Sequence, residues 1–183
     1  MYRRWLIVFA STLLLWSLVG QLNHCLAPYS VFISAGGLMV TFAALRLNLR
    51  NGLTATILIA LAVDSVEPVP AVGHHLLYGP HLLLFTTAHV FIFHLRTRFP
   101  REEVLFALGT ALVANLGMFL GLFFIYVELA APSASGTAAL RMLADLGWSQ
   151  LFILVTAPWF FSLQQRALEL CNFDLSEENH RFY

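Results

Sequence analysis

The sequence predicts an all-α integral membrane protein in which six transmembrane helices form one bundle. Five long stretches contain no Asp, Glu, Lys or Arg; they are residues 5–45, 51–63, 68–95, 104–127 and 146–165. Of the 183 residues, 59% are hydrophobic and only 11% are charged, and the mean hydropathy is +0.77. A bilayer core accepts helices of about 20 apolar residues, whereas a water-soluble domain of this size could not bury so much uncharged surface. The arginines fall mostly in alternate gaps between these stretches, which is typical of a chain that crosses a membrane repeatedly.

The first stretch is too long for a single helix. Polar residues and a proline interrupt it near the middle, namely Gln21, Asn23, His24 and Pro28. We therefore expect one helix over 5–22 and another over 29–45, because a proline favours the start of a helix. The chain opens like a signal peptide, with arginines before an apolar run, but that run is longer than the about 7–15 residues of a signal. We expect it to be retained as the first transmembrane helix.

The remaining stretches predict four more spans, over 51–66, 74–95, 102–129 and 147–166. The third opens at Asn51-Gly52 and ends before Pro68 and Pro70, which cannot continue a helix. In the fourth span, Gly79-Pro80 predicts a kink.

A short segment separates the last two spans. Residues 137–146 predict a small helix on the membrane surface, in which Arg141 and Asp145 form an i,i+4 pair. The expected organisation is one transmembrane domain over 1–166 and a cytoplasmic tail over 167–183.

The arginines predict how the bundle is oriented. If the N-terminus is cytoplasmic, nine of the ten arginines lie in cytoplasmic segments: Arg3, Arg4, Arg46, Arg50, Arg96, Arg98, Arg101, Arg166 and Arg181. Only Arg141 lies in an outer segment. This asymmetry follows the positive-inside rule, so both termini are expected inside. Taking the short third span out of the bilayer would break the alternation.

Asp64, near the outer end of the third span, is the acidic residue closest to the membrane core. Such a charge faces a partner or a cavity, or it touches headgroup water as an interfacial carboxylate. Glu67 adds a second acid three residues later. Five histidines crowd the fourth span: His74, His75, His81, His89 and His94. They are expected to be hydrogen-bonded inside the bundle rather than to form a metal or proton path, and Asp64 could pair with His74 or His75.

Small residues predict close helix packing in the fifth span. Gly117 and Gly121 form a GxxxG pattern near Asn115, and Gly36-Gly37 plays the same role in the second span. Packing inside the bundle is the favoured interpretation, and dimerisation is the alternative. The sequence contains no phosphate-binding glycine loop, nucleophile–base motif or metal-ligand spacing, so we predict no enzyme activity, no cofactor and no metal. A formal net charge of zero makes nucleic acid an unlikely ligand.

One stretch resembles a known family. The segment NGLTATILIALAVD, residues 51–64, is followed by a proline-containing turn and then by GHHLLY, residues 73–78. This resembles the rod shape-determining protein MreD of bacteria, in which a glycine opens a short helix, an aspartate closes it and a glycine precedes the next helix. Gly52, Asp64 and Gly73 match that pattern. The chain length, the number of spans and the lack of a hydrophilic domain also agree.

The resemblance implies a non-enzymatic, multi-pass component of the cell-elongation machinery in the bacterial inner membrane. Such a protein would scaffold an MreC-like protein and the peptidoglycan synthases; the implied partners are MreC, MreB, RodA, a penicillin-binding transpeptidase and membrane lipid. The family's fold also resembles the substrate-binding subunit of energy-coupling-factor transporters. A small-molecule-binding subunit is therefore the alternative, with Asp64, Glu67, His74 and His75 as pocket candidates. A membrane protein unrelated to either group is a third interpretation.

Overall fold

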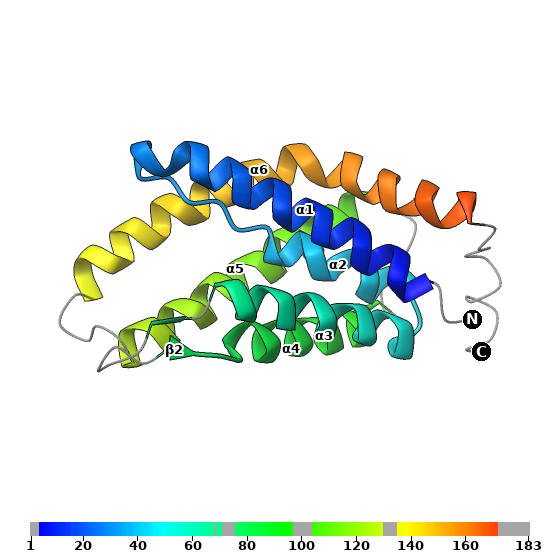
Figure 1. Cartoon of the computed structure of the whole chain (residues 1–183), viewed down its shortest axis with the longest axis horizontal. Coiled ribbons are helices and arrows are strands. Elements are labelled where there is room, and N and C mark those ends of the chain that lie inside the picture. Colours follow the sequence, from blue (N-terminus) through cyan, green and yellow to red (C-terminus); the bar gives the residue numbers. More distant parts are fainter. Residues whose placement is uncertain (1–3, 68, 71–75, 97–103, 130–134, 172–183) are drawn as a thin grey trace.

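Six α-helices lie roughly along one long axis in the computed structural model, which describes residues 4–67, 69–70, 76–96, 104–129 and 135–171 (Figure 1). They are α1 (Arg4–Leu26), α2 (Gly36–Arg46), α3 (Leu49–Val66), α4 (Pro80–Leu95), α5 (Val104–Leu129) and α6 (Ser135–Leu170). Four of these helices, α1, α3, α5 and α6, contain segments long and apolar enough to cross a membrane, whereas α2 and α4 are shorter apolar helices. The prediction of an all-α protein with helices long and apolar enough to span a membrane is confirmed for these four helices.

The second predicted span is only partly helical. Helix α1 continues to Leu26 and is followed by a 3-10 turn, η1 (Ala27–Tyr29). Ser30 then adopts a left-handed backbone conformation with φ of 55°. Residues 31–35 form neither helix nor strand, and α2 begins only at Gly36. The expected helix over 29–45 is therefore too long at its start, because the chain must first turn back at the end of α1.

The boundaries of α3 and α4 also differ from the prediction. Helix α3 begins at Leu49, because the Asn48 side chain caps it by accepting the backbone N–H of Asn51 at 2.8 Å. A short antiparallel hairpin follows α3 and pairs β1 (Val69–Pro70) with β2 (Leu76–Leu77). Helix α4 starts at Pro80, directly after Gly79 with its φ of 112°. Gly79-Pro80 thus marks a helix start and not the kink that the sequence suggested.

Helix α6 is a single helix of 36 residues. The separate surface helix expected over 137–146 is wrong, since these residues form the first turns of α6. Gly147 is the only strong helix breaker near the predicted boundary, and one glycine costs a helix only about 1 kcal/mol. The predicted ion pair is present, with Arg141 Nε at 3.8 Å from Asp145 Oδ2.

Helix α2 lies at the centre of the bundle. Every residue from Gly36 to Leu45 is buried, and α3, α4 and α5 pack around this helix. The remaining helices, α1 and α6, pack against each other and close one side of the bundle (Figure 1). A helix that is apolar on all sides lies in a protein core or in a bilayer. Helix α2, the shortest of the six described α-helices, lies in the core of the bundle.

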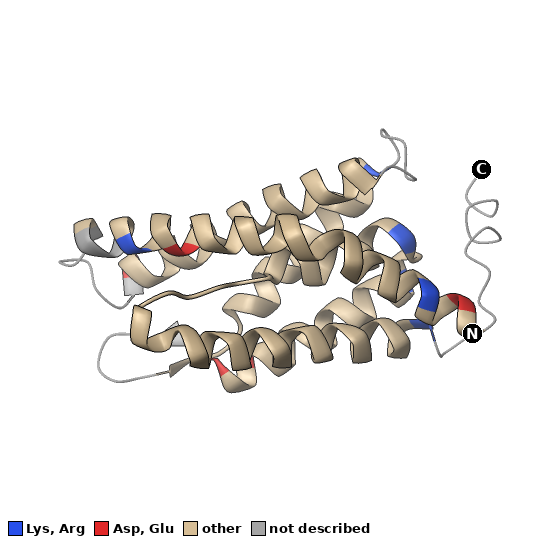
Figure 2. Ribbon diagram, turned by 90° about the horizontal axis from the view of Figure 1, so that it is seen from above, with Lys and Arg blue, Asp and Glu red and all other residues tan. Residues whose placement is uncertain are grey.

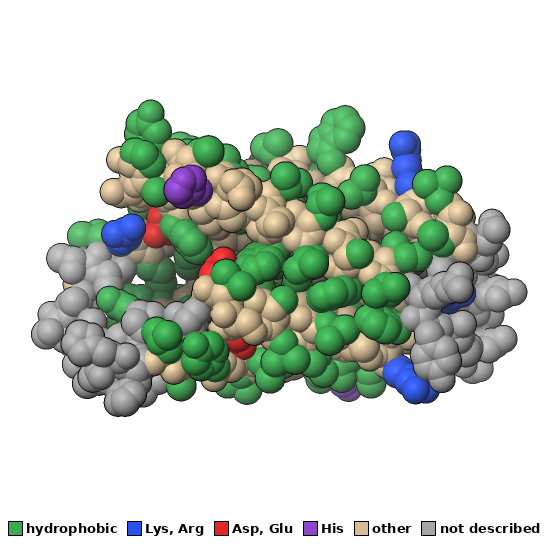
Figure 3. Space-filling view, viewed as in Figure 1, with side chains coloured by type: hydrophobic (Ala, Val, Ile, Leu, Met, Phe, Trp, Pro, Cys, Tyr) green, Lys and Arg blue, Asp and Glu red, His purple; other side chains and the backbone are tan. Residues whose placement is uncertain are grey.

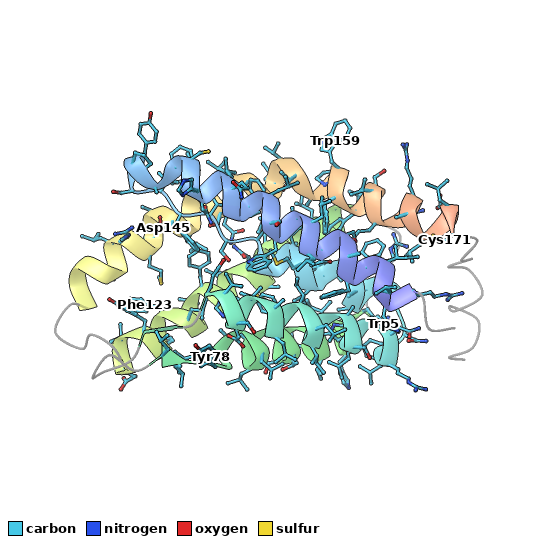
Figure 4. The ribbon with its side chains drawn as sticks, in the orientation of Figure 1. Trp5, Tyr78, Phe123, Asp145, Trp159 and Cys171 are labelled. Carbon is cyan, nitrogen blue, oxygen red and sulfur yellow. The ribbon has the colours of Figure 1, made fainter. Side chains whose placement is uncertain are left out.

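The outer surface of the bundle is apolar along its length and charged at its ends. Figure 3 shows hydrophobic side chains spread over the visible face, and Figure 4 shows Trp159 pointing away from the bundle. The Trp159 side chain is 80% exposed. Five of the described arginines lie at helix ends that Figure 1 places together: the start of α1 (Arg4), the end of α2 (Arg46), the first turn of α3 (Arg50), the end of α4 (Arg96) and the last turns of α6 (Arg166). Arg141 lies in the first turns of α6, at the opposite end, and Figure 2 shows basic residues at both ends of the bundle. We refer to the first of these as the arginine-rich end.

Candidate functional site

Asp64 caps the start of α4. Its Oδ2 accepts the backbone N–H of Leu82 at 2.9 Å, and its Oδ1 accepts the backbone N–H of His81 at 3.0 Å. The residue is only 3% exposed. Helix α4 needs this distant carboxylate because its N-cap residue, Gly79, has no side chain that could accept a hydrogen bond. A negative charge at a helix N-terminus is also favourable with respect to the helix dipole.

The histidine beside Asp64 is His81. Its Nδ1 lies 2.8 Å from Asp64 Oδ1, and because an ionised carboxylate only accepts hydrogen bonds, the imidazole N–H is the donor. The predicted partners of Asp64, His74 and His75, lie outside the described residues, as does Gly73. The sequence shows that the helix opening at Gly79-Pro80 lacks its own capping side chain, but this does not distinguish His81 from the other histidines of the span.

Glu67 occupies a different environment from Asp64. It is exposed, and its Oε1 accepts the indole N–H of Trp16 at 3.2 Å, which ties α1 to the end of α3. Trp16, Glu67 and His81 border a small cavity of about 30 Å³ at this end of the bundle. That volume holds about one water molecule.

The non-helical residues 31–35 obtain hydrogen bonds from side chains on neighbouring helices. Asn23 of α1 pairs with Ile33 in both directions, donating to its carbonyl and accepting its N–H at 2.8 Å each. From α6, Asp145 accepts the N–H of Phe32 at 3.0 Å and Ser149 accepts that of Ser34 at 2.9 Å. Figure 4 marks Asp145 on this part of α6.

In the first turn of α2, directly after these non-helical residues, Gly37 forms a hydrogen bond with a third helix. Its N–H donates to Asn115 Oδ1 of α5 at 3.2 Å. Non-helical backbone is tolerated at membrane depth only where protein groups satisfy it, and here three helices supply them. The sequence analysis missed this network, because Asn23 was interpreted as a loop residue and Asp145 only as the partner of Arg141.

A second polar cluster lies deeper in the bundle, around Gly52. A Cβ at Gly52 would lie 2.6 Å from the carbonyl oxygen of Ala43 and 2.8 Å from the His89 ring, so α2, α3 and α4 meet here at very short range. His89 is fully buried, and its Nδ1 forms a 2.8 Å hydrogen bond with the Thr56 hydroxyl. Gly52 is therefore needed for the packing of three helices around His89.

Arg96 fixes the end of α2 from the last turn of α4. The side chain is buried, and its Nη1 donates to the carbonyl oxygens of Ala44 at 3.1 Å and Leu47 at 2.6 Å. Its guanidinium also lies over the Phe93 ring at 3.8 Å. A cation at a helix C-terminus satisfies carbonyls that have no partner within the helix. From the sequence, Arg96 was expected only as one of the nine cytoplasmic arginines.

The two glycines of the GxxxG pattern have different surroundings. A Cβ at Gly121 would lie 2.5 Å from Leu84 Cδ2 of α4, whereas a Cβ at Gly117 would meet nothing within 4 Å. The closest helix crossing instead involves Gly37, where a Cβ would fall against the carbonyl oxygen of Ala111 and 2.5 Å from the backbone nitrogen of Asn115. The prediction that Gly117 packs closely inside the bundle is therefore wrong. The close approach of α5 to α2 is at Gly37.

The described histidines do not gather at one place. His81 contacts Asp64, His89 contacts Thr56, and His94 bonds within its own helix. In the part of the chain that the structure describes, no group of three His, Cys, Asp or Glu side chains is placed to hold a metal ion. The polar residues described here therefore act on backbone groups and on each other, and they hold helices in fixed positions.

Comparisons of the chain with models of protein families, with curated protein sequences and with solved structures found no match.

Proposed function

We propose that this chain is a non-enzymatic, MreD-like component of the bacterial cell-elongation machinery. It would cross the inner membrane six times with both termini inside, and it would scaffold an MreC-like protein and the peptidoglycan synthases. The observation that carries the proposal concerns Gly52 and Asp64, two residues that match the MreD pattern. Gly52 lies where three helices meet, and Asp64 caps α4 from the end of α3. Both fix α3 relative to its neighbours, as a scaffold requires.

The competing proposal is a small-molecule-binding subunit of an energy-coupling-factor transporter. Such a subunit needs a polar cavity at the outer end, and ligand cavities usually measure about 300–1,000 Å³. The cavity beside Glu67 and His81 measures about 30 Å³ as the described residues shape it. In addition, both Asp64 oxygens already accept hydrogen bonds from α4. These two features favour the scaffold over the transporter subunit.

The scaffold proposal is tested in the organism that encodes the chain. Cells depleted of the protein should lose rod shape and regain it when the full chain is expressed from a plasmid. The tagged chain should also co-purify with the MreC-like protein of the same genome. A neighbouring pair of MreB and MreC genes would agree with this result. Normal cell shape after depletion, together with no co-purification, would rule out the scaffold.

A second measurement separates the two proposals. The purified chain in detergent is titrated with vitamins of the kinds that energy-coupling-factor systems import. The scaffold proposal expects no saturable binding. Saturable binding of one vitamin, with normal cell shape after depletion, would assign the chain to transport.

A further inference from the structure

A cavity of about 300 Å³ opens at the arginine-rich end, between the last turn of α2, the start of α5 and the final turns of α6. Neither Gly52 nor Asp64 lines this cavity. Its walls differ sharply in chemistry along the bundle axis, with polar side chains toward the end of the molecule and aromatic and aliphatic side chains toward the middle.

The polar rim carries a net positive charge. Two arginines, Arg46 of α2 and Arg166 of α6, line the cavity together with one acid, Glu169, which gives a rim charge of +1. Glu169 accepts a 2.9 Å hydrogen bond from the Gln165 amide. Within the described residues, neither the Arg46 nor the Arg166 side chain makes a hydrogen bond or an ion pair.

The Arg46 side chain is not needed to satisfy the carbonyl groups at the end of α2. A basic residue in the last turn of a helix commonly satisfies the terminal carbonyls of that helix. Here Arg96 binds the carbonyls of Ala44 and Leu47, so these groups already have a donor from α4. The Arg46 guanidinium is half-buried at the mouth of the cavity and can bind a ligand there.

The floor of the cavity is apolar. Phe42, Pro158 and Phe161 line it below the arginines. Pro158 lies eight residues before Arg166 on α6, which corresponds to about 12 Å along the helix axis. The cavity thus extends from the level of the charged helix ends into the apolar part of the bundle.

We infer that this cavity binds an anionic phospholipid. Its phosphate lies between Arg46 and Arg166, because guanidinium groups bind phosphate oxygens in a planar, bidentate geometry. The first part of an acyl chain lies against Phe42 and Phe161. Basic pockets between helices on the cytoplasmic side of a membrane protein bind anionic headgroups in this way. The rim charge of +1 discriminates against zwitterionic lipids, and the apolar floor discriminates against soluble phosphates.

The test uses the full chain purified in a non-ionic detergent. Phosphatidylglycerol is titrated, and the fraction of protein that carries one lipid is measured by native mass spectrometry. Phosphatidylcholine with the same acyl chains and soluble glycerol phosphate are titrated in parallel. We expect saturable binding of phosphatidylglycerol, weaker binding of phosphatidylcholine and no competition by glycerol phosphate.

The matched variants are Arg46→Gln, Arg166→Gln and Arg50→Gln. Each of the first two should weaken phosphatidylglycerol binding about fivefold, the effect expected for one arginine near an anionic surface. Arg50 is exposed at the same end but does not line the cavity, so its variant should bind like the wild type. Arg166 is exposed, and Arg166→Gln therefore tests the site even if Arg46→Gln fails to fold.

Three outcomes would overturn the inference. An equal loss of phosphatidylglycerol binding in Arg50→Gln would mean that binding depends only on the overall charge of this end. Equal binding of phosphatidylcholine would remove the role of the rim charge. Competition by glycerol phosphate would identify a soluble phosphate ester as the ligand.

Discussion

At the scale of single residues, polar side chains replace caps and hydrogen bonds that the local sequence lacks. Asp64 does this for α4, whose N-cap position is a glycine, and Arg96 does it for the end of α2. Each interaction joins two helices that are adjacent in space. These side chains therefore stabilise individual helix ends and determine how neighbouring helices are aligned.

Asp64→Asn is expected to destabilise the fold. The variant keeps the size of the side chain, but it loses the charge and exchanges one acceptor oxygen for a donor amide that faces the N–H groups of α4. Leaving a buried donor without a partner costs about 1–3 kcal/mol. Thermal unfolding in detergent, followed by circular dichroism, measures the effect, and Glu67→Gln at an exposed site is the control. Equal unfolding temperatures for the two variants would contradict the capping role.

Alanine substitutions at two glycines should have very different effects on the free energy of unfolding. Gly37→Ala places a methyl group against the backbone of α5, and overpacking of this kind costs about 1–3 kcal/mol. Gly117→Ala enters open space and should be neutral or stabilising, because alanine favours a helix over glycine by about 1 kcal/mol. Chemical unfolding in the same detergent compares them. If Gly117→Ala is the more damaging change, the helix crossing at Gly37 is not the tight one.

At the scale of elements, the non-helical residues 31–35 depend on α1 and α6 for their hydrogen bonds. Their amides are bound by Asn23, Asp145 and Ser149, so the loss of one acceptor leaves a backbone donor inside the bundle without a partner. This dependence explains how a short non-helical segment can lie among apolar helices.

Ser149→Ala tests that dependence. It removes the acceptor of the Ser34 N–H and should cost about 1 kcal/mol, with faster hydrogen exchange at residues 31–35. Ser65→Ala is the matched control, since the Ser65 hydroxyl also donates to a carbonyl four residues earlier but accepts no distant amide. Exchange at residues 31–35 that is unchanged in Ser149→Ala would show that other groups satisfy this backbone.

The sequence identifies the apolar elements better than it identifies their ends. Long uncharged runs predicted five of the helices within a few residues at most boundaries, because apolar length is a property of the local sequence. The late start of α2 and the continuity of α6 depend on contacts with distant residues, such as Asn23 and Asp145. For the same reason Asp64 was recognisable as a special residue, whereas its partner His81 was not.

At the scale of the whole molecule, the charges separate along the bundle axis. Five described arginines lie at one end and Arg141 lies at the other, although they come from segments that are far apart in the sequence (Figures 1 and 2). The helix packing therefore brings together the residues that the positive-inside rule assigns to one side of the membrane.

This separation of charge agrees with the predicted topology of six spans with both termini in the cytoplasm. Reporter fusions after residues 27, 70 and 138 should report the outer side, and fusions after 48, 98 and 175 should report the cytoplasm. Paired periplasmic and cytoplasmic reporters measure each position, and the fusion after residue 175 serves as the reference for the C-terminus. A periplasmic signal at residue 98 would overturn the six-span arrangement.

The hydrogen bonds of residues 31–35 have a consequence for synthesis of the protein. Phe32 and Ser34 leave the ribosome more than a hundred residues before Asp145 and Ser149, the side chains that bind their amides. During that interval the segment must satisfy its backbone in another way, and in lipid the available way is to be helical. The final conformation therefore requires a local unwinding after α6 has been inserted. A nascent chain that stops before residue 145 should keep these residues helical, which makes the arrival of α6 the step that completes the bundle.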